Sequence, residues 1–327
     1  MRLFPLWLFG WLTLNASADE PATLKLTQTI PLPGVHGRFD HFSVDAKGKR
    51  LFVAALGNDT LEVVDVAANK PLHSITGLHK PTGVAFLPEW NRLIVANGGD
   101  GTLKVFDGDT YQLVKSLGSL DDADNLRYDP KARLLYVGYG NGALGVIDPA
   151  ALVPVASIKL KAHPELFQLE QDGPRIFVNV PDAKQVAVVD RTTRTVTETW
   201  STGEFRANFP MALDEANQRL FVACRNPARL VVLDTKTGKP VADLAIAGDA
   251  ADLFFDAPRK RLYVSCGVGF VDVLEIQSAD AYRLRERIPT VSGARTSFFS
   301  AMLNTYFVAH PLRGTEMAGI RVFQVTE

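Results

Sequence analysis

The sequence has little of several features that define common protein classes. It has only two cysteines and 9% aromatic residues among 327, which excludes a small disulfide-stabilised scaffold. Its 35 basic and 36 acidic residues give a formal net charge of −1, so no overall attraction holds it on nucleic acid or on an anionic membrane. The 46% hydrophobic and 22% charged residues are those of an ordinary globular protein. We therefore expect no nucleic-acid partner.

Motifs for the commonest catalytic and cofactor sites are also missing. The sequence contains no Cys-x-x-Cys-His for covalent haem, no His-Glu-x-x-His for zinc, no Gly-x-Ser-x-Gly nucleophile turn and no phosphate-binding Walker loop. It therefore predicts no cofactor and names no catalytic residue. Whether the chain is an enzyme stays open at this point.

One apolar run stands at the N-terminus. Residues 1–18 begin with a positive charge at Arg2, continue with an apolar stretch from Leu3 to Leu14, and end on Ala16-Ser17-Ala18. This order is typical of a secretory signal peptide. The run is too short to span a bilayer, which takes roughly 20 apolar residues. We expect cleavage after Ala18, no membrane anchor thereafter, and a periplasmic or secreted protein.

A short apolar phrase recurs along the rest of the chain. Its seven copies end in valines spaced 41 to 44 residues apart, namely Val53, Val95, Val137, Val178, Val222, Val264 and Val308. A second phrase, such as Val63-Val64-Asp65, follows each copy, and shorter apolar segments lie before and after the two phrases. Each unit thus contains four short strands separated by turn residues. Four-stranded units at this period are typical of β-propeller blades.

The sequence therefore predicts an all-β fold in which residues 19–327 form one domain, a seven-bladed β-propeller with four antiparallel strands per blade. The seventh unit ends at Glu327 after only three strands. Residues 24–31 have the pattern of residues 282–289, the fourth strand of the sixth unit. We expect the N-terminal strand to complete the last blade and close the ring, which removes exposed strand edges. We expect the protein to be a monomer.

The units resemble the YVTN-type propeller repeat of YncE-like exported proteins. The copy from Leu93 to Gly98, with Val105-Phe106-Asp107, is the nearest to that pattern. The resemblance covers essentially the whole mature chain. It implies kinship with propellers that carry a haem d1 nitrite-reductase site or form the β-subunit of quinoprotein amine dehydrogenases. The YVTN pattern has no invariant catalytic motif, so it transfers no active-site residue to this chain.

In a propeller, the loops that lead into the innermost strands meet around the central channel. We predict that this loop-rich face binds a small polar ligand or a protein partner, without catalysis, through side chains from these loops and neighbouring strand ends: Arg38, Asp40, His41, Asp124, His163, Glu165, Arg206, Asn208, Arg225, Asp252, Arg295 and His310.

The same residues leave other interpretations open. One alternative is an enzyme, such as a lactonase, a lyase or an oxidoreductase subunit, that uses carboxylate and histidine groups at the channel mouth. Another is an auxiliary subunit of a redox enzyme. A purely structural interpretation is that the loop side chains cap turns and pair with one another.

Two acid–histidine pairs stand out in these loops. Asp40 and His41 are adjacent, and neighbours on an extended strand are expected to point to opposite faces. His163 and Glu165 are two residues apart and are expected to share a face, although Pro164 between them also favours a rigid turn.

Two cysteines and a histidine occupy equivalent positions in three successive units. Cys224, Cys266 and His310 each lie two residues after an aligned valine. This placement suggests either a disulfide or a copper or zinc site, to which Asp252 or His41 could add a ligand. Packed sheets lie about 10 Å apart, however, whereas a disulfide needs Cα atoms within roughly 7 Å. We therefore expect two unpaired, buried thiols and no metal.

Overall fold

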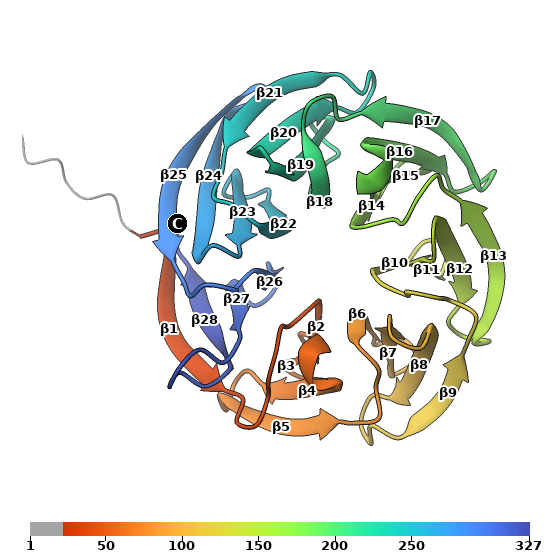
Figure 1. The fold of residues 1–327 in the computed structure, drawn as a ribbon, viewed down its shortest axis with the longest axis vertical. Coiled ribbons are helices and arrows are strands. Elements are labelled where there is room, and N and C mark those ends of the chain that lie inside the picture. The colour runs from red at the N-terminus through yellow and green to blue at the C-terminus, as the bar shows by residue number, and fades with distance from the viewer. Residues whose placement is uncertain (1–21) are drawn as a thin grey trace, which may run out of the picture.

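The computed structural model describes residues 22–327, so the predicted signal peptide at residues 1–18 lies outside the described residues. The described chain forms seven four-stranded antiparallel sheets arranged as a ring (Figure 1). This arrangement confirms the predicted seven-bladed β-propeller. Its helical content in this range is two single-turn 3-10 helices, Leu56–Asn58 and Pro181–Ala183. Within residues 22–327, no helix is long and apolar enough to cross a membrane.

Blades 1 to 6 are each built from four strands that are consecutive in the sequence and run from the channel outward (Figure 1). Blades 1 to 3 consist of β2 (Phe42–Asp45), β3 (Arg50–Ala55), β4 (Thr60–Asp65) and β5 (Lys70–Ile75); β6 (Pro81–Leu87), β7 (Arg92–Asn97), β8 (Thr102–Asp107) and β9 (Leu113–Leu117); and β10 (Leu126–Asp129), β11 (Leu134–Tyr139), β12 (Ala143–Asp148) and β13 (Val153–Lys159).

Blades 4 to 6 repeat the arrangement. They consist of β14 (Phe167–Leu169), β15 (Arg175–Val180), β16 (Gln185–Asp190) and β17 (Thr195–Ser201); β18 (Arg206–Asp214), β19 (Arg219–Asn226), β20 (Ala228–Asp234) and β21 (Pro240–Ala245); and β22 (Ala250–Asp256), β23 (Arg261–Cys266), β24 (Phe270–Ser278) and β25 (Ala281–Pro289).

Blade 7 joins the two ends of the described chain. It consists of β26 (Thr296–Ser300), β27 (Thr305–His310), β28 (Gly319–Val325) and β1 (Leu24–Pro31). β1 pairs antiparallel with β28 along its length, as predicted from the repeat. The backbone N–H and the hydroxyl of Thr23 donate to Glu286 Oε2 at 2.7 and 2.6 Å, which ties the strand to blade 6 as well. The ring is therefore closed by hydrogen bonds between distant parts of the chain.

The second recurring phrase of the sequence ends in an aspartate because that residue makes a turn. The carboxylate of Asp65 accepts a hydrogen bond from the backbone N–H of Ala68 at 2.7 Å, and that of Asp190 accepts one from Thr193 at 2.8 Å. Aspartate side chains stabilise turns in this way by bonding to backbone a few residues on. The repeated phrase thus marks the return from the third strand of a blade to the fourth.

The hydrophobic core lies between neighbouring blades. Phe52 and Val63 of blade 1 belong to one cluster with Leu93 and Val95 of blade 2, and all four side chains are fully buried. Each junction between blades holds a cluster of this kind. Because every blade packs against two others, the loops at the inner edges of the blades are held in fixed positions around the channel.

Candidate functional site

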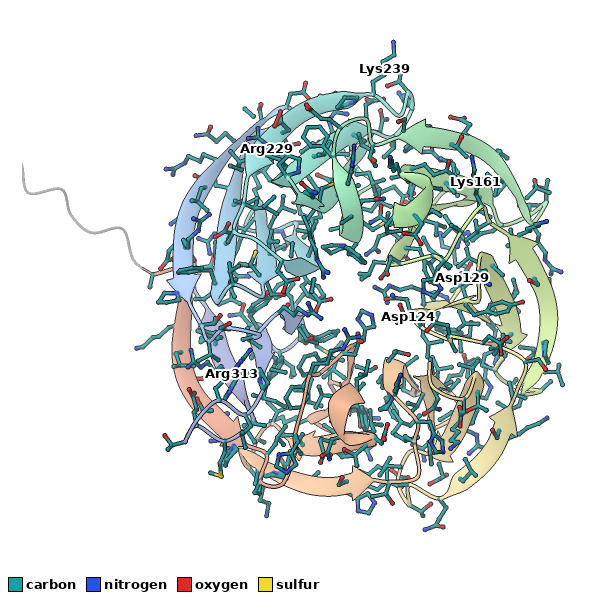
Figure 2. The ribbon with its side chains drawn as sticks, in the orientation of Figure 1. Asp124, Asp129, Lys161, Arg229, Lys239 and Arg313 are labelled. Carbon is teal, nitrogen blue, oxygen red and sulfur yellow. The ribbon has the colours of Figure 1, made fainter. Side chains whose placement is uncertain are left out.

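A cavity of about 250 Å³ opens where the inner loops meet. Nine of the twelve residues predicted for this face line it: Arg38, Asp40, His41, Asp124, His163, Glu165, Arg225, Asp252 and Arg295. Figure 2 shows Asp124 at the edge of the central opening. The structure brings these side chains together from six of the seven blades. That they bind a ligand stays a prediction.

One residue from every blade lies at the same register of this cavity. Each is 13 positions before the aligned valine of its unit, and the seven in blade order are Asp40, Thr82, Asp124, Glu165, Phe209, Ala251 and Arg295. The repeat therefore builds a ring of equivalent positions. Only some of these positions carry a charge, so the chemistry of the cavity is uneven around the ring.

A β-bulge directs two consecutive side chains into the cavity. In blade 1 the backbone N–H of Asp40 donates to Ala54 O at 2.8 Å, and the N–H of Ala54 donates to His41 O at 3.0 Å. Two residues thus oppose one, which defines a bulge and redirects the side chains around it. The expectation that Asp40 and His41 point to opposite faces is therefore wrong, because it assumed a regular strand.

The same bulge recurs in blades 3 and 4. Asp124 N–H donates to Gly138 O at 2.9 Å while Gly138 N–H donates to Asn125 O at 3.0 Å. In blade 4, Asn179 bonds in the same way to Glu165 and to the residue that follows it, at 2.9 and 3.1 Å. Bulges are frequent beside functional sites because they re-aim side chains.

Blade 2 contributes no charged group to the cavity, but it positions the loop of blade 3. The hydroxyl of Thr82 donates to Ala123 O at 2.7 Å. Gly83 lies so close to that loop that an added Cβ would be 2.1 Å from the carbonyl oxygen of Asp124. Only glycine permits this approach of the two backbones. Asp124 is therefore held from the neighbouring blade as well as from its own.

Imidazole and carboxylate groups gather on one side of the cavity, around His41. Its Nε2 lies 3.4 Å from Asp40 Oδ1 and 3.8 Å from Asp124 Oδ1. Its Nδ1 lies 3.8 Å from Asp252 Oδ1. Asp252 is almost fully buried and also accepts a hydrogen bond from the backbone N–H of Ser297 at 2.7 Å.

The second imidazole, His163, approaches Asp124 from the other side. Its Nε2 lies 3.9 Å from Asp124 Oδ2, and its Nδ1 lies 2.7 Å from Gly140 O. One carboxylate oxygen of Glu165 lies within 4.8 Å of the ligand atoms of both. His163 and Glu165 therefore face the same cluster, as expected from their spacing. The side chain of Glu165 forms no hydrogen bond or ion pair with any residue of the described chain.

The crowding of acidic groups changes their protonation. The nearby carboxylate of Asp124 raises the pKa of His163 to about 9. Burial, assisted by the charge of Asp124, raises the pKa of Glu165 to about 8. Burial likewise raises the pKa of Asp252 to about 6 and also raises that of Asp40. At neutral pH the cluster is therefore short of positive charge, and part of it relieves the repulsion by holding protons.

Three arginines, Arg38, Arg225 and Arg295, also line the cavity, and Arg38 Nη2 donates to Asp40 Oδ2 at 3.2 Å. Arg225 Nε donates to Ala250 O at 2.7 Å, and its guanidinium lies 4.0 Å from the centre of the Phe209 ring. Arg295 Nη1 lies 3.0 Å from Asp249 Oδ1. Burial lowers the pKa of Arg225, and the neighbouring Arg295 and Arg38 lower it further, which shows that the three cations are close enough to repel one another. Such a group of guanidinium donors is suited to an anion.

Three predicted residues do not line the cavity. Asn208 is fully buried and donates to Asn179 Oδ1 at 2.8 Å and to Gln185 O at 3.1 Å, so it fastens blade 5 to blade 4. Arg206 is the first residue of β18, and its side chain is exposed. His310 is buried at the end of β27, away from the cavity lining. These three residues therefore lie outside this cavity, because a place near the channel does not decide which way a side chain points.

Sequence reasoning also missed lining residues. Asp122, Thr82 and Phe209 belong to the cavity. Arg127, on β10, lines a second cavity of about 340 Å³ that shares His41 and Asp252 with the first. Burial lowers the pKa of Arg127. An arginine between the apolar residues Leu126 and Tyr128 of an innermost strand was the signal that could have identified it.

The two cysteines lie in separate places. Cys224 belongs to the cluster between blades 4 and 5 and Cys266 to the cluster between blades 5 and 6, and both are free and buried. Among residues 22–327, the groups of side chains whose ligand atoms converge enough for a metal contain no cysteine; they are Asp40–His41–Asp124 and Asp124–His163–Glu165. The alternative of a copper or zinc site at Cys224, Cys266 and His310, which the sequence did not favour, gains no support from these groups.

Comparison with known proteins identifies the architecture of this chain. No family model and no curated protein matches the sequence. Among solved structures, a chain of "Kuenenia stuttgartiensis Hydrazine Synthase" is similar with a TM-score of 0.75 and 18% identity, over 86% of this chain and 96% of that one. A chain of the "Crystal Structure of Mitotic Checkpoint Complex" is similar with a TM-score of 0.78 and 13% identity, over 100% of this chain and 99% of that one. Identities this low support the propeller fold and no particular activity.

Proposed function

We propose that this propeller binds a small polar ligand with an anionic group in its central cavity. The observation that carries the proposal is that one cavity holds three guanidinium groups, those of Arg38, Arg225 and Arg295, beside its carboxylate and imidazole groups. Guanidinium groups recognise carboxylates and phosphates through paired hydrogen bonds. The volume of about 250 Å³ lies just below the usual range of roughly 300–1,000 Å³ for ligand pockets. This size favours a small molecule over a folded partner.

Thermal unfolding in the presence of malonate, inorganic phosphate or glycine tests the proposal. Malonate and phosphate are expected to raise Tm, since a ligand at 100 times its Kd stabilises by about 2.7 kcal/mol. Arg225→Gln should weaken their binding at least about 10-fold, because a charged hydrogen bond contributes about 1.5–3 kcal/mol. Arg229→Gln, on the outer part of the same blade, is the matched control (Figure 2). Stabilisation by glycine alone, or no effect of Arg225→Gln, would contradict an anion site.

A second candidate function is acid–base catalysis on the bound molecule, in the manner of a lactonase, a lyase or a subunit of an oxidoreductase. The observation that favours it is the convergence of Asp124, His163 and Glu165 within 4.8 Å of one another at the cavity wall. An imidazole held between carboxylates is an arrangement that serves proton transfer. Hydrolysis of a panel of simple lactones by the wild type but not by Glu165→Gln would support it. Equal rates for the two proteins would remove it.

We further propose that the protein is exported, is a monomer, and is related to the YVTN-type propellers. The N-terminal pattern of residues 1–18 supports export, and the seven repeated phrases support the relationship. N-terminal sequencing of protein recovered from the periplasm or medium is expected to begin at Asp19. Size-exclusion chromatography with light scattering should give the mass of one chain. A start at Met1, or a multiple of that mass, would refute the corresponding proposal.

A further inference from the structure

The carboxylate of Asp124 faces two imidazoles, one through each oxygen. Oδ1 lies 3.8 Å from Nε2 of His41, and Oδ2 lies 3.9 Å from Nε2 of His163. Asp40 joins the first pair, with Oδ1 at 3.4 Å from His41 Nε2. Glu165 joins the second, with all ligand atoms within 4.8 Å of one another. The cluster therefore consists of two groups of three ligands that share Asp124.

These separations are close to those of a loaded metal site. Histidine nitrogens and carboxylate oxygens bind zinc at about 2.0–2.2 Å, which places neighbouring ligand atoms of a tetrahedral site about 3.4 Å apart. The distances from His41 to Asp40 and Asp124 and from His163 to Asp124 are 3.4 to 3.9 Å, at most about half an ångström above that value. The other pairs in each group lie within 4.8 Å. Small side-chain rotations close such a gap.

Both imidazoles have the orientation that a metal requires, and that of His163 is fixed by a hydrogen bond. His163 directs Nδ1 to the backbone oxygen of Gly140 at 2.7 Å, and His41 directs Nδ1 toward Asp252 Oδ1 at 3.8 Å. Both acceptors lie outside the two ligand groups. A metal-binding histidine almost always uses its second nitrogen for a backbone carbonyl or a carboxylate in this way. In both residues the remaining nitrogen, Nε2, faces Asp124.

The second ligand group contains a carboxylate that has no partner among the described residues. Glu165 is largely enclosed, faces the like charge of Asp124, and has neither a hydrogen bond nor an ion pair with a described residue. A carboxylate beside another is unfavourable unless it is protonated or a cation neutralises it. We propose that this side of the cavity binds two divalent transition-metal ions, of the type of Zn²⁺ or Mn²⁺, bridged by Asp124.

This arrangement goes beyond the proposed ligand site and does not depend on it. Mixed imidazole and carboxylate donors suit zinc, iron and manganese. Three protein ligands per ion leave coordination positions open toward the cavity, as in sites where a metal contacts a substrate or water. Three carboxylates supply three negative charges against the four positive charges of two ions, so the loaded site would attract an anion.

Titration of the metal-stripped full chain with Zn²⁺ or Mn²⁺ alone, followed by calorimetry, tests the inference without any organic ligand. We expect two ions per chain. Asp124→Asn keeps the shape of the side chain but removes the bridging charge, and it should weaken the binding of both ions at least about 100-fold, more than the 10–100-fold typical of an outer-shell change. Circular dichroism of the metal-free variant shows whether it is folded.

The controls separate this site from the rest of the surface. His79 and Asp100 form an exposed imidazole–carboxylate pair, with Nε2 3.9 Å from Oδ2, so Asp100→Asn should leave the titration unchanged. His41→Gln and His163→Gln should each alter the visible absorption of bound Co²⁺. No binding, binding that Asp124→Asn does not weaken, or a single ion sensitive to only one of the two histidines would overturn the bridged pair. A negative result in the metal titration would not affect the proposed anion binding by the three arginines, which the thermal unfolding experiment tests separately.

Discussion

Gly83 is the position at which one methyl group would most directly move Asp124. A Cβ at residue 83 would lie 2.1 Å from the carbonyl oxygen of Asp124 and 3.1 Å from its carbonyl carbon. Favourable contacts between non-bonded atoms begin at roughly 3.5 Å, so Gly83→Ala requires the two backbones to separate by about 1.4 Å. Because the atom in the way belongs to the backbone, no side-chain rotation relieves the overlap.

The cost of this displacement follows from the size of the protein. Overpacking a tightly filled site destabilises by about 1–3 kcal/mol. Unfolding entropy is about 2.1 cal/mol/K per residue, or roughly 0.6 kcal/mol/K for a ring of about 300 residues. We therefore expect Gly83→Ala to lower Tm by about 2–5 °C. The shift of Asp124 should also weaken Mn²⁺ binding about 10–100-fold, the usual effect of disturbing the support of a metal ligand.

Gly118 provides the matched control, since no atom lies within 4 Å of a Cβ built there and the residue is exposed. Thermal unfolding by circular dichroism and calorimetric Mn²⁺ titration are to be compared among the wild type, Gly83→Ala and Gly118→Ala. Gly118→Ala should match the wild type in both. If Gly83→Ala also matched it, the contact between blades 2 and 3 would not position Asp124, and the reasoning would be refuted.

Two further predictions test the ring and its thiols. Ile30→Ala in the closing strand removes a fully buried side chain from the cluster between blades 7 and 1 and should destabilise the fold by about 2–5 kcal/mol. The control is Leu26→Ala, at a half-exposed position of the same strand, which should cost under about 0.5 kcal/mol. Equal denaturation midpoints for the two variants would contradict closure by β1. Burial raises the pKa of Cys224 to about 12 and also raises that of Cys266, so a thiol reagent at pH 8 should label neither cysteine in the folded protein and both after unfolding. Rapid labelling of the native protein would show that the blade junctions open.

The period of the sequence predicted the blades because every unit meets the same packing and turn requirements. It also predicted Asp40, Asp124 and Glu165 in the cavity, since residues at one register of a repeat occupy one place in the fold. The register also explains why Asn208 does not line the cavity. It lies one position earlier in its unit, the register of Phe39 and Ala123, and all three are buried. Polarity suggested a binding role for Asn208, whereas its register placed it in the junction between blades.

The orientation of Asp40 and His41 could not be predicted from the sequence for a different reason. Alternation along a strand is a local rule, and the bulge that breaks it depends on two hydrogen bonds to Ala54 in the next strand. The exclusion of His310 has a similar basis. Its register is that of Asn97, Val180 and Cys224, all fully buried, so the ends of the second strands face the junctions rather than the channel.

The seven blades differ in the residue that each places at the equivalent position of the cavity. The seven equivalent positions of the cavity ring carry acids in blades 1, 3 and 4 and an arginine in blade 7, while Thr82, Phe209 and Ala251 are uncharged. The acids of neighbouring blades 3 and 4 meet Asp40 across the channel, where two imidazoles converge on Asp124. A symmetric ring of seven acids would repel any anion and surround a cation too widely to bind it. Uneven substitution of one repeated position instead places acids, an arginine and uncharged residues around one small cavity.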